Sequence, residues 1–128
     1  MVNKQFHATL LAVAMILAAS AASGANPFVD AFHAGSSAED SGNLDDAIKY
    51  FSEAIKLHPT AARAWAKRGE VNLKKGDPQA AIKDLTQAVK IDPAYAPAYT
   101  RLGYAYNAVN EFDRAVEALT IAIALDSN

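Results

Sequence analysis

The fold is decided by residues 65–93, which read WAKRGEVNLKKGDPQAAIKDLTQAVKIDP. The first half of this stretch consists mostly of good helix formers, and Gly76 marks the expected end of that helix. Asp77 and Pro78 are typical of a helix start, as a capping side chain followed by a first-turn proline. Apolar residues then recur at helical spacing until Pro93. The stretch therefore predicts two antiparallel helices joined by a short turn.

The same pattern occurs on both sides of this stretch, at the 34-residue spacing of positions 35, 69 and 103. Aligned on its prolines, the chain divides into three units, residues 28–61, 62–95 and 96–128. Chance does not produce five matching columns at one spacing. These columns are Gly35, Gly69 and Gly103; Ala47, Ala81 and Ala115; Phe51, Leu85 and Leu119; Ala54, Ala88 and Ala122; and Ile55, Val89 and Ile123.

This period resembles that of the tetratricopeptide repeat. The pattern of that repeat has an aromatic residue, Leu-Gly and Tyr on the first helix, followed by Ala, Phe and a final Pro. The third unit is the nearest match in its first helix, with Tyr99, Leu102, Gly103 and Tyr106. The resemblance implies an all-α, right-handed superhelical solenoid of antiparallel helix pairs. It also implies a concave groove lined mainly by the first helix of each pair, and three repeats are about the minimum for stability.

Composition narrows the classes of function. The chain has 128 residues, of which 12 are basic and 14 acidic, so it is near neutral and bounded at roughly one domain. This balance argues against a polybasic nucleic-acid binder. The sequence contains no cysteine, which excludes disulfides, thiolate metal sites and cysteine nucleophiles. Stability must therefore come from packing.

Residues 1–25 resemble a secretory signal peptide, with Lys4 before an uncharged apolar segment, residues 8–19, and small residues after it. The apolar segment is shorter than the ~20 residues that a membrane-spanning helix needs. We therefore expect a cleaved bacterial signal, with a mature chain that begins between Ala22 and Asn26, and a periplasmic or secreted protein. The alternative is an uncleaved segment that anchors the protein to the membrane.

Charged residues form a stripe on the first helix of the second unit. Together with residues of the third unit they form the candidate partner-binding groove, which consists of Arg63, Lys67, Glu70, Lys74, Arg101, Tyr104 and Asn107. We expect this mainly cationic groove to bind an extended segment or a helix of a partner protein. The simpler interpretation is a solvated helix face with ordinary pairs between Lys67, Glu70 and Lys74.

Some tetratricopeptide co-chaperones bind a C-terminal carboxylate with Lys, Asn and Arg on three successive first helices. Lys67 and Arg101 occupy plausible basic positions for such a clamp, but Phe32 and Ser36 stand where the first unit would need Lys and Asn. Pro97 also replaces a Lys in the third unit. The carboxylate clamp is therefore not supported by this sequence.

Two departures from the repeat pattern carry expectations of their own. The first helix has small residues at the aromatic, Leu and Tyr positions, namely Ala31, Ala34 and Ala38, so we expect it to be loosely held. In the second unit Arg68 occupies the Leu position and Asn72 the Tyr position. We expect the stem of Arg68 to pack while its guanidinium reaches solvent.

The last helix carries apolar residues where the earlier units are polar. We expect the side formed by Ala118, Ile121 and Leu125 to be buried in a homo-oligomer or partner interface, because terminal repeats need a polar outer face for solubility. Against this hypothesis, a single exposed Ile or Leu needs no explanation.

Nothing in the sequence indicates catalysis. His33 and His58 lack a second histidine at metal-ligand spacing, and there is no Gly-x-Ser-x-Gly elbow or glycine-rich phosphate loop. The carboxylates are expected at capping or solvent-facing positions. We therefore expect no enzyme, cofactor, metal or nucleic-acid partner, and predict a non-catalytic protein-interaction module. The alternative is a small structural subunit that assembles through its C-terminal helix.

Overall fold

The computed structural model describes residues 24–127, so nearly all of the predicted signal segment, residues 1–25, lies outside the described residues. Within the described range the chain forms six helices and no strand, which confirms the all-α prediction. None of the helices in this range is long and apolar enough to cross a membrane. The helices are α2 (Pro27–Asp40), α3 (Leu44–Leu57), α4 (Ala62–Lys75), α5 (Pro78–Ile91), α6 (Ala96–Ala108) and α7 (Phe112–Asp126).

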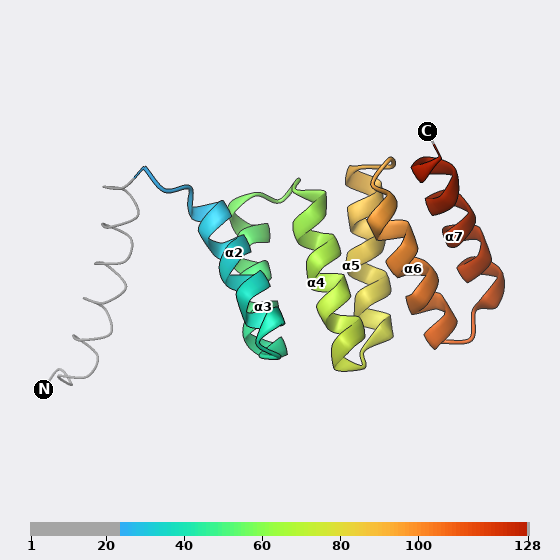
Figure 1. Ribbon diagram of the computed structural model, residues 1–128, viewed down its shortest axis with the longest axis horizontal. Helices are drawn as coiled ribbons and strands as arrows, with labels where there is room; N and C mark the ends of the chain where they lie inside the picture. The colour runs from blue at the N-terminus through green and yellow to red at the C-terminus, as the bar shows by residue number, and fades with distance from the viewer. Residues whose placement is uncertain (1–23, 128) are drawn as a thin grey trace, which may run out of the picture.

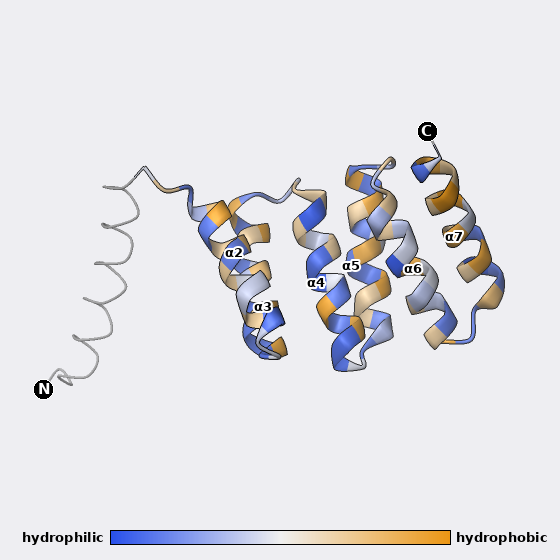
Figure 2. Cartoon of the chain, viewed as in Figure 1, coloured by the Kyte–Doolittle hydropathy of each residue, from blue (hydrophilic) through white to orange (hydrophobic). Residues whose placement is uncertain are grey.

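The helices pack as consecutive pairs, α2 with α3, α4 with α5 and α6 with α7. Figure 1 shows these pairs side by side along the long axis of the molecule, in chain order. Between pairs, α4 contacts α3 and α6, and α6 also contacts α5. Figure 2 shows hydrophobic and hydrophilic residues mixed along every helix, as expected for helices that each bury one side. The arrangement is a helical solenoid.

The turn inside each pair follows the predicted chemistry. Asp77 caps α5, since its side chain accepts a hydrogen bond from the Ala80 amide at 3.1 Å. Before it, Gly76 ends α4 in the left-handed conformation, with φ at 87°. The equivalent turns place Gly42 and Asn110 at φ 78° and 63°. Glycine and asparagine tolerate this conformation best, so one turn type serves all three pairs.

Within each pair, a glycine on the first helix faces a large side chain on the second. A Cβ added to Gly69 would lie 2.7 Å from Leu85 Cγ, closer than real contacts allow. The same relation holds between Gly35 and Phe51 and between Gly103 and Leu119. These glycines therefore let paired helices approach closely, and the large side chains that they receive form the centre of each pair.

The first helix, α2, packs through residues other than the three alanines that occupy its aromatic, Leu and Tyr positions. The Phe32 ring lies edge-on to Phe51 with centroids 5.4 Å apart, and Phe28 lies 5.4 Å from the His58 ring. Asn26 caps the helix by accepting from the Phe28 amide at 3.0 Å. Two phenylalanines thus supply contacts that the three alanines cannot. That α2 is loosely held stays a prediction.

The second pair contains a buried polar cluster in addition to its apolar centre. Arg68 donates to both carboxylate oxygens of Asp84 at 2.8 Å and to Ser52 Oγ of α3 at 3.1 Å. Asn72 donates to the same carboxylate at 3.1 Å. Asp84 is only 4% exposed. Arg68 keeps 22% of its side chain exposed, so its guanidinium binds Asp84 and still borders solvent. The solvent-facing or capping assignment for Asp84 is wrong, because this carboxylate is buried and Arg68 compensates its charge.

We predict that Asp84→Ala lowers the free energy of unfolding by about 3 kcal/mol, because it removes the buried carboxylate that pairs with the partly buried Arg68 guanidinium. The double variant Arg68→Leu/Asp84→Ala carries the residues of the third pair at these positions, Leu102 and Ala118. It should regain most of that loss, since an apolar replacement removes both charges. Urea unfolding followed by circular dichroism measures both. A double variant less stable than Asp84→Ala would contradict this account.

Candidate functional site

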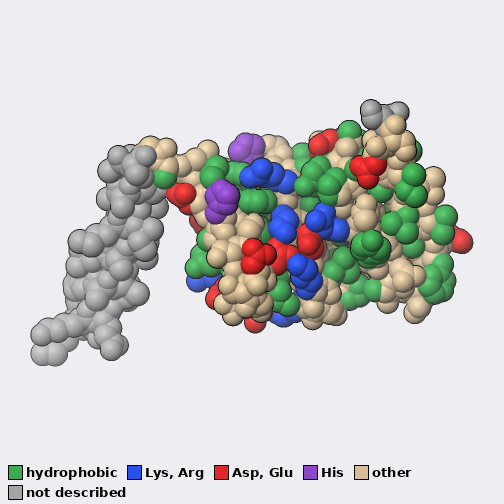
Figure 3. All heavy atoms as spheres, viewed as in Figure 1, with side chains coloured by type: hydrophobic (Ala, Val, Ile, Leu, Met, Phe, Trp, Pro, Cys, Tyr) green, Lys and Arg blue, Asp and Glu red, His purple; other side chains and the backbone are tan. Residues whose placement is uncertain are grey.

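The predicted groove residues lie on the face formed by α2, α4 and α6. Figure 3 shows Lys and Arg side chains next to Asp and Glu side chains in the middle of this face, with hydrophobic side chains gathered toward α6 and α7. Five of the central side chains contact one another across three helices. We call them the charge network: Glu39 of α2, Lys67, Glu70 and Lys74 of α4, and Arg101 of α6.

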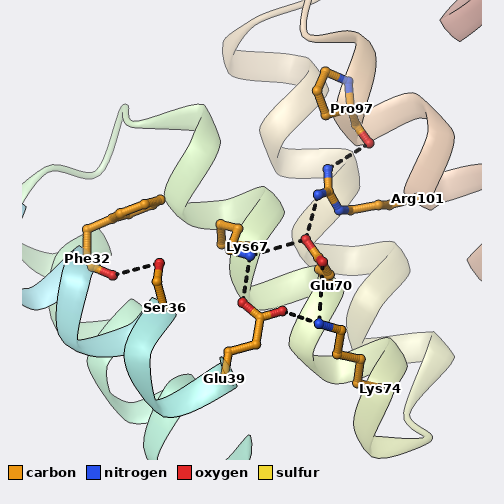
Figure 4. Close-up of polar contacts among 8 residues, drawn as sticks. All are labelled: Phe32, Ser36, Glu39, Lys67, Glu70, Lys74, Pro97 and Arg101. Atoms are coloured by element: carbon orange, nitrogen blue, oxygen red, sulfur yellow. Dashed lines mark hydrogen bonds and ion pairs between the residues drawn. The ribbon is translucent and has the colours of Figure 1, made fainter. Parts of the chain in front are cut away.

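Glu39 holds the α2 end of the charge network. Its side chain is 3% exposed, and its two oxygens lie 2.6 Å from Lys67 Nζ and 2.5 Å from Lys74 Nζ. The contact to Lys67 is an ion pair without hydrogen-bond alignment, since that carboxylate oxygen has no hydrogen-bond partner among the described residues. Figure 4 shows the Glu39 carboxylate between the two ammonium groups. One buried carboxylate thus binds two lysines of the neighbouring pair.

Glu70 extends the charge network from α4 to α6. Its carboxylate lies 2.6 Å from Arg101 Nη2, and 3.5 and 3.6 Å from the ammonium groups of Lys67 and Lys74. The intrahelical pairs expected from the sequence are therefore present. Arg101 also donates to the carbonyl of Pro97 at 3.1 Å (Figure 4). The charge network consequently joins all three helix pairs through side chains on one face.

The expected cationic patch is largely neutralised, because the three cations of the charge network are paired with two carboxylates and only one net positive charge is left. Sequence reasoning missed Glu39, although a signal was available. Glu39 lies 34 residues before Leu73, which lies 34 residues before Asn107, so Glu39 shares the repeat column of a residue assigned to the groove. Its burial also corrects the expectation that the carboxylates face solvent or cap helices.

Arg63 is not part of the charge network. Its guanidinium lies 4.2 Å from the ring centroid of Phe32 and 5.9 Å from that of Phe28. A cation over an aromatic face is attracted by the ring quadrupole. Arg63 therefore contributes to holding α4 against α2.

A hollow of about 660 Å³ lies beside the charge network, between α4 and α6. Four of the predicted groove residues line it, Glu70, Lys74, Arg101 and Tyr104, whereas Arg63, Lys67 and Asn107 do not. Tyr104 is 61% exposed. Tyr99 and Tyr106, by contrast, pack against the core, as expected for Tyr106. The remaining lining residues are Leu73, Pro97, Thr100 and, from the end of α7, Asp126.

The predicted edge on the last helix is placed differently by the structure. Ala118 is 5% exposed and packs in the core with Leu85 and Leu102, so its assignment to an open edge is wrong. Ile121 and Leu125 are half-buried. The exposed large apolar side chains of this helix are instead Phe112, Val116 and Ile123.

Across residues 24–127, no three His, Cys, Asp or Glu side chains are grouped so that they could bind a metal ion.

The charge network lowers the pKa of Glu39 and raises the pKa of Lys74. Burial by itself would raise the pKa of Glu39, but the contacts and charges of Lys67 and Lys74 outweigh it and hold that pKa below the ordinary value of 4.5. The hydrogen bond to Glu39 raises the pKa of Lys74 above 10.5. The stabilisation from Glu39 is thus complete above about pH 4.5 and is lost as the pH falls through its lower folded-state pKa. That from Lys74 is complete below about pH 10.5 and is lost above it.

We predict that Glu39→Gln lowers the free energy of unfolding at pH 7 by about 1–2 kcal/mol, since a charged acceptor is replaced by a neutral one. The difference from the wild type should shrink as the pH falls below 4.5, where Glu39 itself becomes protonated. Asp45→Asn is the matched control, because it removes an exposed ion pair with Lys75 that also joins two helix pairs. Urea unfolding at pH 7 and pH 3.5 measures both, and a Glu39→Gln loss that is equal at the two pH values would contradict this account.

Comparison with known proteins agrees with this architecture. A family model described as tetratricopeptide repeat matches residues 32–96, and a second model of the same description matches residues 72–128. No curated protein matches the chain in sequence.

Three solved structures are similar to this chain. The TPR2B domain of yeast Sti1, solved as a pHsp70 complex, is 30% identical with a TM-score of 0.77, and the match covers 79% of this chain and 81% of that one. An Arabidopsis OM64 TPR domain is 26% identical with a TM-score of 0.77, covering 78% and 83%. MamA is 26% identical with a TM-score of 0.74, covering 78% and 58%. From its repeat columns, paired helices and matching family models, this chain belongs to the tetratricopeptide repeat family.

Proposed function

We propose that the protein is a non-catalytic interaction module that binds a segment of a partner protein in the hollow between α4 and α6. The observation that carries this proposal is the hollow itself, about 660 Å³ in volume, with the exposed ring of Tyr104 at its side. Ligand sites are typically concave, with apolar walls and a few polar groups. The similar yeast Sti1 domain, which was solved as a pHsp70 complex, supports a role in binding proteins.

The walls of the hollow indicate what kind of segment fits. Leu73 and Pro97 offer apolar surface, and Tyr104 offers a rigid ring that loses little conformational entropy on binding. The cations that line the hollow, Lys74 and Arg101, already contact Glu70. The segment should therefore carry an aromatic or aliphatic anchor for the apolar walls, and should not depend on a run of acidic residues.

The proposed location follows from the sequence of residues 1–25. A cationic start, an uncharged apolar segment and small residues are typical of an export signal, so the module would act in the periplasm or outside the cell. Its partners would then be exported proteins or the outer parts of membrane proteins.

We predict that panning a random peptide display library on the purified protein selects peptides that share an apolar anchor residue. Tyr104→Ser should weaken these peptides by about 10-fold or more, because a central aromatic contact is a typical binding hot spot. Fluorescence anisotropy with a labelled selected peptide measures the affinity.

Tyr50→Ser is the matched control for this test, because Tyr50 is also exposed, at 39%, but lies on α3. It should leave the affinity unchanged. Peptides that bind Tyr104→Ser as tightly as the wild type would place the binding surface elsewhere. A library that yields no binder would argue against a peptide-binding role.

The exposed apolar side chains of α7 favour a second role, that of a small subunit which assembles through this helix. Assembly of this kind does not require the hollow between α4 and α6. Substitutions at the hollow and on α7 would therefore affect different activities, and each role can fail without the other.

A further inference from the structure

Exposed apolar surface is concentrated on the last helix pair. The described residues include six large hydrophobic side chains that are exposed, and four of them belong to α6 and α7. On α7 the values are 57% for Phe112, 64% for Val116 and 68% for Ile123. These three lie at positions i, i+4 and i+11, which fall on one side of a helix. We call this side the open face of α7.

In the first pair, the residues equivalent to the open face of α7 are covered by the next helix. Ile55 occupies the same repeat column as Ile123, but it is only 7% exposed because it packs with Ala64 of α4. Ile48 occupies the column of Val116 and packs in a cluster with Val71 of α4. In the first pair these positions are thus covered by the next helix along the chain. The open face of α7 has the same chemistry without such a cover among the described residues.

The opposite end of the molecule does not complement this face. In α4 and α6 the residues that pack against the preceding pair are Ala64, Val71, Ala98 and Ala105, all fully buried. The corresponding residues of α2 are Asp30 and Ser37, and both are exposed. Stacking α2 of one molecule on α7 of another would therefore bury a carboxylate and a hydroxyl against valine and isoleucine, which is unfavourable. A head-to-tail filament is disfavoured for this reason.

We propose that the open face of α7 binds the same face of a second copy of this chain, with the two α7 helices antiparallel about a twofold axis. The open face is nearly symmetric about Thr120, since Val116 lies about one helical turn before it and Ile123 about one turn after it. A twofold axis near Thr120 places Val116 of each copy against Ile123 of the other. An isologous contact of this kind uses one patch twice and closes at two subunits.

Charge and size fit this arrangement. The open face consists of Phe112, Val116, Thr120, Ile123 and Ser127, all of them exposed and none of them charged. A helix of this length is about 22 Å long and 10 Å wide, so one face buries a few hundred Å² in each copy. Stable interfaces usually bury about 800 Å² per partner, so this one lies at the low end. We therefore expect dimerisation in the micromolar range.

Analytical ultracentrifugation over a concentration series tests the proposal. The wild type should pass from monomer to dimer and form no larger species. Val116→Glu/Ile123→Glu should weaken the dimer by about 100-fold or more, because each substitution is present twice in the interface. Leu57→Glu is the matched control, since Leu57 is a 47% exposed side chain at the end of α3, and it should leave dimerisation unchanged. Circular dichroism confirms that the variants are folded.

Disulfide trapping tests the twofold axis itself. The chain has no cysteine, so a single introduced cysteine reports one contact. Thr120→Cys should give a covalent dimer on mild oxidation, because residues near a twofold axis meet their own copies. Ser37→Cys, an exposed position on α2, should not.

Four results would overturn the proposal. They are a wild type that stays monomeric at about 100-fold above micromolar concentration, a dimer that survives Val116→Glu/Ile123→Glu, larger oligomers that grow with concentration, and no trapping through Thr120→Cys. None of these results bears on the hollow between α4 and α6, because Val116→Glu/Ile123→Glu should still bind the selected peptides.

Discussion

Each helix pair in this chain has two sides to bury and can cover neither of them alone. The structure follows from how each end of the array meets this constraint. In the middle, α4 and α5 are packed between the first and third pairs. At the start, α2 turns Asp30 and Ser37 outward where the later pairs have buried alanine and valine. At the end, α7 keeps its apolar column exposed. The two ends therefore differ in chemistry although the pairs share one architecture.

The middle pair also carries most of the polar interactions that cross between pairs. On one side Arg68 binds Asp84 and reaches Ser52 of α3. On the groove face, Lys67 and Lys74 bind Glu39 of α2. Buried polar groups are costly when they are incompletely paired, so each set favours one register of α4 against its neighbours. Apolar packing brings the pairs together, and these polar contacts select how they meet.

The repeat period predicted the helices well because the glycine and alanine columns act locally, each within one pair. Gly69 and Leu85 could be matched from the sequence, as could the Asp77 cap. The polar contacts between different helices were not predicted, because each position was compared only with its own repeat column. Arg68, Asn72 and Asp84 are polar at positions where the third unit has Leu102, Tyr106 and Ala118. Three such differences in one pair are the signal that indicates a polar cluster. Ile121 was chosen because its repeat column is polar in the earlier units, and Ala118 and Leu125 were added as its neighbours. Exposure at the end of the array depends instead on the apolar columns that no following helix covers.

The charge network also limits what the groove selects. Lys67 and Lys74 each contact two carboxylates, so their side chains are held in place before any partner arrives. An acidic partner would have to compete with Glu39, which is buried, already paired with both lysines and part of the same chain. Competition with an intramolecular carboxylate reduces the gain from a new ion pair, whereas the apolar walls beside Tyr104 have no such competitor. Affinity in this groove should therefore come from the apolar anchor, and the ordered lysines should mainly fix the orientation of the bound segment.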